Sequence, residues 1–173
     1  CVPKLPSFVV GYNSVRGIQD KGLFKKPAAM INAGLKYEYT CWLDTDIEFL
    51  DNITDIFNYV EPGKLAMCED LPWSKRRGEK WHNSGVVAFH KVPTILRQWA
   101  AGVAANPVQG DQEVLHFMLR GDPMRKLVHI CDIPRQYNVL RLDHIDNTIP
   151  KEPKVYHWTG LKGKEHIRSL ING

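Results

Sequence analysis

The feature that most constrains this chain is the stretch from Tyr39 to Leu50, YTCWLDTDIEFL. Its first half is aromatic, apolar and β-branched, which is the composition of a buried β-strand. Two carboxylates, Asp44 and Asp46, follow at positions i and i+2. In an extended chain this spacing places both side chains on one face, about 7 Å apart, because each residue rises about 3.3 Å. The stretch therefore predicts a strand whose end presents two acids to one point.

Two carboxylates directed at one point repel each other unless a cation lies between them. Their oxygen atoms suit a hard divalent ion such as Mg²⁺ or Mn²⁺, which can also be shared with a diphosphate. Residues 51–57 (DNITDIF) then have the pattern of a helix start, with Asp51 as its N-cap. The two acids are thus expected where a strand gives way to a loop, the usual place for ligands in open α/β sheets. The alternative is a solvated turn that binds nothing.

Length, charge and cysteine content limit the classes of protein that remain. A chain of 173 residues with 43% hydrophobic residues fits one globular domain, which we assign to residues 1–173. Its formal charge is only +4 and no long basic run is present, so nucleic acid is not an expected partner. The four cysteines are scattered without a C-x-x-C pair, which indicates neither a zinc site nor a disulfide framework. Buried thiols in a reducing, cytoplasmic compartment fit this pattern best.

The chain shows no membrane-spanning or targeting segment. No stretch approaches the roughly 18 continuous apolar residues that a membrane span needs, and no signal peptide is visible. The first residue is Cys1 rather than Met, and we expect a fragment whose N-terminal part is absent.

Helical and strand patterns alternate along the chain. Strands are predicted at about 7–11, 64–68, 84–89, 127–131 and 154–158, and helices at about 25–36, 53–60, 92–103 and from 111 onward. The segments 12–24 and 71–83 have no periodicity and are predicted to be loops. This alternation indicates an α/β sandwich with a mixed, mostly parallel central sheet.

Polar residues also stand at the ends of other predicted elements. Asn83 and Ser84 come directly before one strand, and Gly85 permits close approach of the backbone there. Asp111 and Gln112 begin a predicted helix, where the helix dipole favours an acid. An ordinary loop-to-strand turn and an ordinary helix start are the alternatives for these two motifs.

The C-terminal region adds a histidine and two lysines. His157 ends an apolar run, and a segment with glycines and lysines follows it. Lys162 and Lys164, on a flexible glycine-containing backbone, suit the charge of a diphosphate. A structural histidine and a solvated tail are the alternatives.

The order of these motifs resembles the GT-A glycosyltransferases, most closely family 8, the group of glycogenin and the bacterial lipopolysaccharide galactosyltransferases. The matching motifs are Lys26, WLDTD (42–46), DNITDIF (51–57), NSGV (83–86), DQ (111–112) and HWTG (157–160). The resemblance implies a GT-A type α/β/α sandwich that transfers a hexose, with retention, from a nucleotide diphosphate sugar. It further implies a UDP-linked donor and a hydroxyl acceptor on a glycan, a lipid-linked molecule or a protein.

The resemblance also implies roles for individual residues. Asp44, Asp46 and His157 are expected to hold the metal, and the imidazole favours Mn²⁺ over Mg²⁺. Asp111 and Gln112 are the expected catalytic pair beside the anomeric carbon. The expected contacts to the nucleotide sugar are Lys26, Asp44, Asp70, Asn83, Ser84, Gly85, Gly160, Lys162 and Lys164. The family has a lysine six residues after the histidine, where this chain has Gly163 between two lysines.

Two other interpretations remain open. A haloacid-dehalogenase-type phosphohydrolase also carries Asp-x-Asp after a strand, but it has Thr or Val two residues on, where this chain has Glu48. The second alternative is a non-catalytic fragment that binds a nucleotide sugar. The stereochemical outcome is also open, and for an inverting enzyme Asp111 or Glu113 would be the candidate base.

Overall fold

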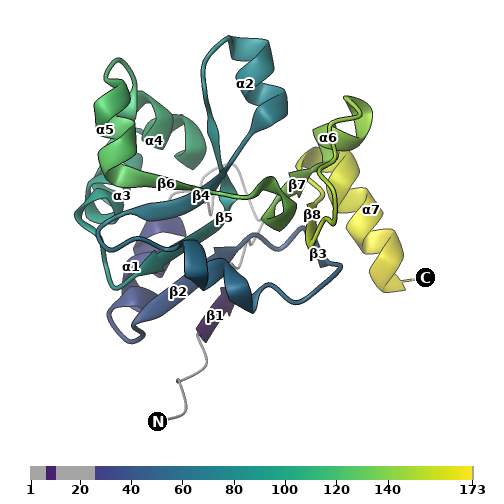
Figure 1. Cartoon of the computed structure of the whole chain (residues 1–173), viewed down its shortest axis with the longest axis horizontal. Helices are drawn as coiled ribbons and strands as arrows, with labels where there is room; N and C mark the ends of the chain where they lie inside the picture. Colours follow the sequence, from purple (N-terminus) through teal and green to yellow (C-terminus); the bar gives the residue numbers. More distant parts are fainter. Residues whose placement is uncertain (1–6, 11–25, 173) are drawn as a thin grey trace.

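The largest element of the fold is a five-stranded sheet with the strand order β1-β2-β5-β4-β6 (Figure 1). The computed structural model describes residues 7–10 and 26–172, and the predicted loop at 12–24 lies outside them. The strands are β1 (Ser7–Val10), β2 (Tyr39–Leu43), β4 (Leu65–Glu69), β5 (His82–His90) and β6 (Ile130–Ile133).

Strand directions confirm a mixed, mostly parallel sheet. The pairs β1–β2 and β4–β6 are parallel, whereas β5 pairs antiparallel with both β2 and β4. Among these five described strands, β5 therefore runs against the other four. The predicted α/β class and GT-A type sheet are confirmed.

Alternating side chains of the central strands divide into two hydrophobic clusters, as the period-two geometry of a strand requires. Trp42, Met67 and Phe89 belong to a cluster with buried residues of α1 (Lys26–Gly34), α3 (Thr94–Ala105) and α4 (Asp111–Leu119). These helices therefore cover one face of the sheet.

The second cluster lies on the opposite face. It contains Cys41, Val86 and Cys68 together with Ile56 of the 3₁₀ helix η2 (Thr54–Tyr59) and Tyr137 of η3 (Arg135–Tyr137). The described cysteines are free and buried, as predicted for buried thiols: Cys41, Cys68 and Cys131.

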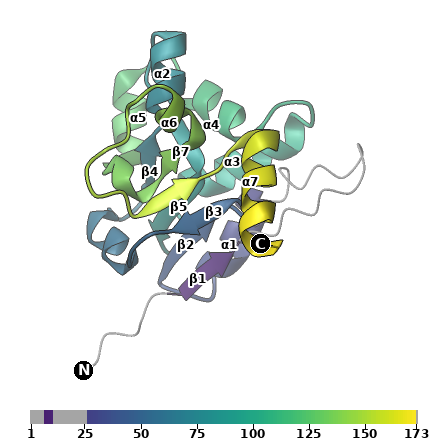
Figure 2. The ribbon, with the colours of Figure 1, turned by 90° about the vertical axis from the view of Figure 1, so that its right-hand side faces the viewer.

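A small sheet stands at one side of the molecule, with strand order β3-β8-β7. It consists of β3 (Ile47–Phe49), β8 (Val155–His157) and β7 (Val139–Leu140). Figures 1 and 2 show this sheet beside α6 (Arg141–Ile145) and α7 (Gly160–Asn172), on the side away from α3, α4 and α5. The predicted loop after Asp46 is therefore strand β3, which pairs antiparallel with β8.

Several local predictions from the sequence are wrong, because short helices leave little periodicity to detect. The predicted loop at 71–83 contains α2 (Leu71–Arg77) and the start of β5. The Asp70 carboxylate caps α2 by accepting the Trp73 N–H at 3.0 Å. The predicted strand at 127–131 begins as the end of α5 (Pro123–His129) and becomes β6 only at Ile130.

Two further predictions also need correction. The N-cap of η2 is Ile53 and not Asp51. The Asp51 carboxylate instead accepts the N–H of Asn52 at 2.7 Å. The glycine-containing segment after His157 is not flexible backbone but the start of the thirteen-residue helix α7.

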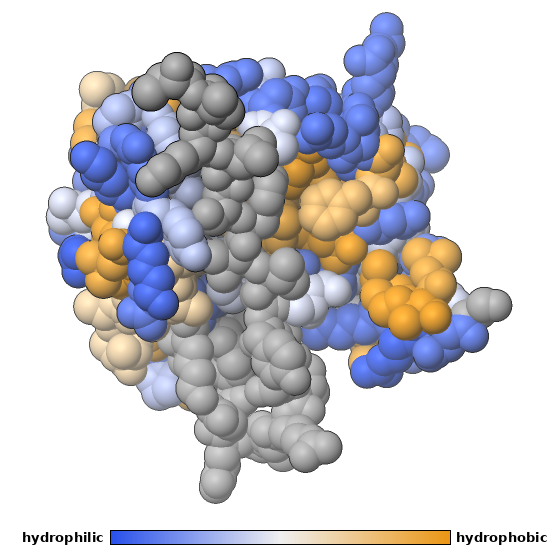
Figure 3. Space-filling model, turned by 90° about the horizontal axis from the view of Figure 1, so that it is seen from below, coloured by the Kyte–Doolittle hydropathy of each residue, from blue (hydrophilic) through white to orange (hydrophobic). Residues whose placement is uncertain are grey.

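The surface of α7 carries exposed hydrophobic residues. Figure 3 shows hydrophobic side chains gathered on the side of the molecule where α7 lies, and Leu170 and Ile171 are exposed there. Within residues 26–172, no helix combines the length and the apolar composition that crossing a bilayer requires.

Candidate metal centre and nucleotide-sugar site

Asp44, Asp46 and His157 come together in space, as the sequence predicts. Each offers one ligand atom, and these atoms lie within 4.8 Å of one another. His157 Nε2 lies 3.2 Å from Asp46 Oδ1 and 3.8 Å from Asp44 Oδ2. Two donor atoms at right angles on one ion, each about 2.1 Å from it, are roughly 3 Å apart. The distances from His157 to the two carboxylates thus fit donors that share a single cation.

Strand pairing explains how residues 111 positions apart along the chain meet. Asp44 and Asp46 lie in the short turn between β2 and β3, and Ile47 of β3 pairs directly with His157 of β8. The Trp158 N–H donates to the Asp46 carbonyl at 2.8 Å, which extends this pairing to the acid itself. The turn is tied to the central sheet because the Asp44 N–H donates to the Gly85 carbonyl at 2.8 Å.

The electrostatics of the cluster also suit a cation. Asp46 is almost completely buried. Burial alone would raise the pKa of the Asp46 carboxyl, but the hydrogen bond and charge of His157 outweigh it, so the pKa lies below its ordinary value. Two oxygen donors and one nitrogen donor form a set that Mn²⁺ accepts. The residues therefore fit the expected metal.

Lys26 forms the charged centre of a second group of contacts. Its ammonium lies 2.9 Å from Asp44 Oδ1 and 3.0 Å from Asp111 Oδ2, and it donates to the Ser84 carbonyl at 3.2 Å. Burial lowers the pKa of Lys26, but the two carboxylates outweigh it, so the pKa is above its ordinary value. An ammonium has three N–H groups, and these three partners can occupy all of them. Lys26 thus fixes the positions of Asp44 and Asp111.

Asp70, Asn83 and Gln112 form a polar network next to this ion pair. Asn83 Nδ2 donates to Gln112 Oε1 at 3.0 Å and to Asp70 Oδ2 at 3.3 Å, and Gln112 Nε2 donates to Asp70 Oδ2 at 3.2 Å. The Ser84 N–H donates to Gln112 Oε1 at 3.2 Å, which fixes the orientation of that amide. Burial raises the pKa of the Asp70 carboxyl, although the hydrogen bonds it accepts oppose this. Asp111 does not join this network, because its carboxylate faces Lys26.

The His157 ring leaves no room for a side chain at position 85, so glycine is needed there. A Cβ atom at this position would lie 2.0 Å from His157 Cε1 and 2.4 Å from its Nδ1. The His157 ring therefore packs directly against the backbone of β5.

The C-terminal lysines lie on a helix. Gly160 begins α7 with φ of 80°, Lys162 is exposed, and Lys164 lies near enough to Asp46 to help lower its pKa. A Cβ atom on Gly163 would lie 1.9 Å from the Trp158 carbonyl oxygen. The structure therefore leaves no room for a lysine at position 163.

Sequence reasoning missed two residues of the site. The Trp42 indole N–H donates to Asp44 Oδ1 at 2.7 Å, which leaves Oδ2 to face His157. Asn138 is buried and hydrogen bonds to both Asn83 and His157. Asn138 could have been suspected from the sequence, because it stands within the apolar run Tyr137–Leu140. A buried amide there would be costly unless it were hydrogen bonded.

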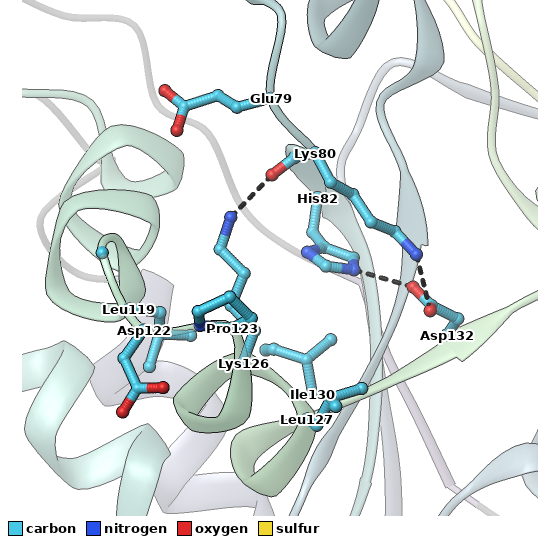
Figure 4. A pocket seen from close by; sticks show the side chains of 11 residues that line it. Glu79, Lys80, His82, Leu119, Asp122, Pro123, Lys126, Leu127, Ile130 and Asp132 are labelled. Atoms are coloured by element: carbon cyan, nitrogen blue, oxygen red, sulfur yellow. Dashed lines mark hydrogen bonds and ion pairs between the residues drawn. The ribbon is translucent and has the colours of Figure 1, made fainter.

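A pocket of about 480 Å³ lies away from the metal cluster, beside α5 and β6 (Figure 4). Part of its charge is paired within the pocket: Asp132 contacts Lys80 at 2.6 Å and His82 at 2.8 Å, and Lys126 donates to the Lys80 carbonyl at 2.7 Å. None of the predicted site residues lines this pocket.

Structural comparison places the chain among glycosyltransferase folds. No protein-family profile matches the chain, and no curated protein is similar to it in sequence. A glycosyltransferase involved in glycosylation of the major capsid of PBCV-1 superposes with a TM-score of 0.62, at 16% identity, over 94% of this chain and 81% of that one. The galactosyltransferase LgtC, in complex with donor and acceptor sugar analogues, has a TM-score of 0.53 at 15% identity and covers 76% of this chain. Mouse xyloside xylosyltransferase 1 has a TM-score of 0.50 at 17% identity.

These likenesses show that the chain has the GT-A type glycosyltransferase fold. The chain spans 57% of the length of LgtC. At such low identity the comparison establishes the fold, and the activity has to be argued from the site.

Proposed function

We propose that this chain is the metal-dependent catalytic region of a glycosyltransferase. It transfers a hexose from a nucleotide diphosphate sugar, with UDP as the expected nucleotide, to a hydroxyl of a glycan, lipid-linked or protein acceptor. The observation that carries the proposal is the convergence of Asp44, Asp46 and His157 at the end of a central strand, in a glycosyltransferase fold.

The metal centre would stabilise the diphosphate leaving group. Asp44, Asp46 and His157 would hold Mn²⁺ or Mg²⁺, and a bound divalent ion stabilises the negative charge of a departing diphosphate. The positive charge of Lys164 acts on Asp46 and would add to that of the metal. Fixed charges that oppose the charge developing in the transition state lower the barrier most.

The polar network would bind the sugar. Asn83 and Gln112 are amides whose orientation is fixed by several hydrogen bonds, so they present donors and acceptors without further reorganisation. Gln112 and Asp111 remain the proposed pair beside the anomeric carbon. Asp111 is held by Lys26 and supplies negative charge next to an oxocarbenium-like sugar.

A donor panel tests the proposal. The protein is incubated with Mn²⁺ and a series of UDP- and other nucleotide-linked hexoses, with and without simple acceptors. We expect transfer, or slow donor hydrolysis, for at least one donor, and loss of this activity in Gln112→Ala. Absence of turnover with every donor would count against the proposal, and UDP binding without turnover would favour the non-catalytic alternative. Binding of beryllium fluoride would favour the phosphohydrolase.

A further inference from the structure

Asn138 connects the candidate metal centre to the polar network. It lies between η3 and β7 and is 1% exposed, so protein groups must satisfy its amide. Its Nδ2 lies 2.9 Å from Asn83 Oδ1, and its Oδ1 lies 3.0 Å from His157 Nδ1.

Hydrogen-bond logic fixes which atom of each amide is the oxygen. The Gly85 backbone N–H, which can only donate, lies 2.9 Å from the side chain of Asn83 and requires Oδ1 there. The Asn138 atom that faces the same oxygen must then be the donor Nδ2. This leaves Asn138 Oδ1, which can only accept, facing His157 Nδ1.

The consequence is a proton on His157 Nδ1. Beside Asp46 the ring can carry a second proton on Nε2, and loss of that proton, with Nδ1–H retained, leaves on Nε2 the lone pair that a metal needs. Nε2 is the atom that faces Asp44 and Asp46. In metalloproteins, the partner of the second ring nitrogen commonly fixes the tautomer and orientation of a ligating histidine.

We propose that Asn138 is a positioning residue that holds His157 with Nδ1 protonated and Nε2 directed at the two aspartates. This extends the proposed function, since it assigns the residue that makes His157 a competent ligand. Two contacts define the ring position: the Asn138 amide at Nδ1 and the bare backbone of Gly85 against Cε1. The same amide holds Asn83, so the ligand and the proposed sugar-binding network share one support.

The protonation state is measured directly by long-range ¹H–¹⁵N NMR on protein labelled in histidine, recorded with and without Mg²⁺. We expect a protonated Nδ1 on His157 in both conditions. An Nδ1 without a proton would overturn the proposal. This readout does not require catalysis or metal binding, so an Nδ1–H in a protein that binds no metal would count against the proposed function alone.

Asn138→Leu tests the role of the amide, since it keeps a similar volume and removes both hydrogen bonds. We expect the Nε2–H form of His157 to appear, and the affinity for Mn²⁺, followed by electron paramagnetic resonance, to fall about 10- to 100-fold. The control is Asn106→Leu, whose exposed amide donates, within the described part of the chain, only to the Gly102 carbonyl and should leave both readouts unchanged. Native protonation and native Mn²⁺ affinity in Asn138→Leu would overturn the proposal. If that variant does not fold, the spectrum of the native protein still decides.

Discussion

Substituting Gly85 by alanine should disable the candidate metal centre by moving one ligand. The added Cβ would lie 2.0 Å from His157 Cε1, whereas ordinary contacts begin near 3.4 Å. The ring or the strand has to give way by about 1.4 Å in total. Distances in metal sites tolerate only about ±0.2 Å. A displacement of this size should therefore cost at least about tenfold in Mn²⁺ affinity, similar to the loss of a supporting contact.

The free energy of unfolding should fall as well. Overpacking of a filled interior costs about 1–3 kcal/mol. Gly85→Ala is therefore expected to remain folded at low temperature, where Mn²⁺ binding is measured by calorimetry and unfolding by urea titration. The matched control is Gly102→Ala in α3, where the nearest atom is the flexible end of Met118.

Gly102→Ala should bind Mn²⁺ as the native protein does. A folded Gly85→Ala variant with native affinity for Mn²⁺ would refute the reasoning, since it would show that His157 is not needed where the structure places it. Equal loss of affinity in both variants would show an effect of added volume in general.

Two further predictions concern charge. Lys26→Met should lower the free energy of unfolding by about 3–5 kcal/mol in urea titration, because it leaves the carboxylates of Asp44 and Asp111 without their shared cation; a loss below about 1 kcal/mol would contradict this. The pKa of His116 should lie below its ordinary value of 6.5, because burial and the charge of Lys126 outweigh the neighbouring carboxylate. The unfolded chain then binds more protons just below pH 6.5, so this histidine makes stability fall as the pH is lowered through that window. An NMR titration midpoint at or above 6.5 would contradict the assignment.

Much of the fold was predictable from local hydrophobic patterns, which can be recognised without knowledge of tertiary contacts. The apolar run of β2 and the helical stripe of α3 are long enough to be recognised from periodicity alone. By contrast, α2 has seven residues and depends on the Asp70 cap and on tertiary packing. The short strand β3 forms because β8 pairs with it across more than one hundred residues of sequence. Such pairing is not visible in a local window.

The same distinction applies to the site. Asp44 and Asp46 were predictable as a pair because two acids at i and i+2 follow directly after a buried strand, although the structure places them in the turn between β2 and β3 and not in extended chain. The reason for Gly85 was only partly predictable, since its role depends on the His157 ring from a distant strand. Asn138 was missed because its contribution is a chain of hydrogen bonds that links Gly85, Asn83 and His157. The role of such a residue becomes apparent only when its partners are known.

The most direct test of the metal centre compares two single-charge substitutions by calorimetric titration with UDP in the presence and absence of Mn²⁺. Asp46→Asn removes a buried ligand charge and keeps the side-chain shape, so Mn²⁺-dependent UDP binding should nearly disappear. Asp51→Asn removes an exposed acid whose carboxylate contacts only the Asn52 N–H among the described residues, and it should leave binding intact. Native binding in Asp46→Asn, or equal loss in both variants, would contradict a metal site formed by Asp44, Asp46 and His157.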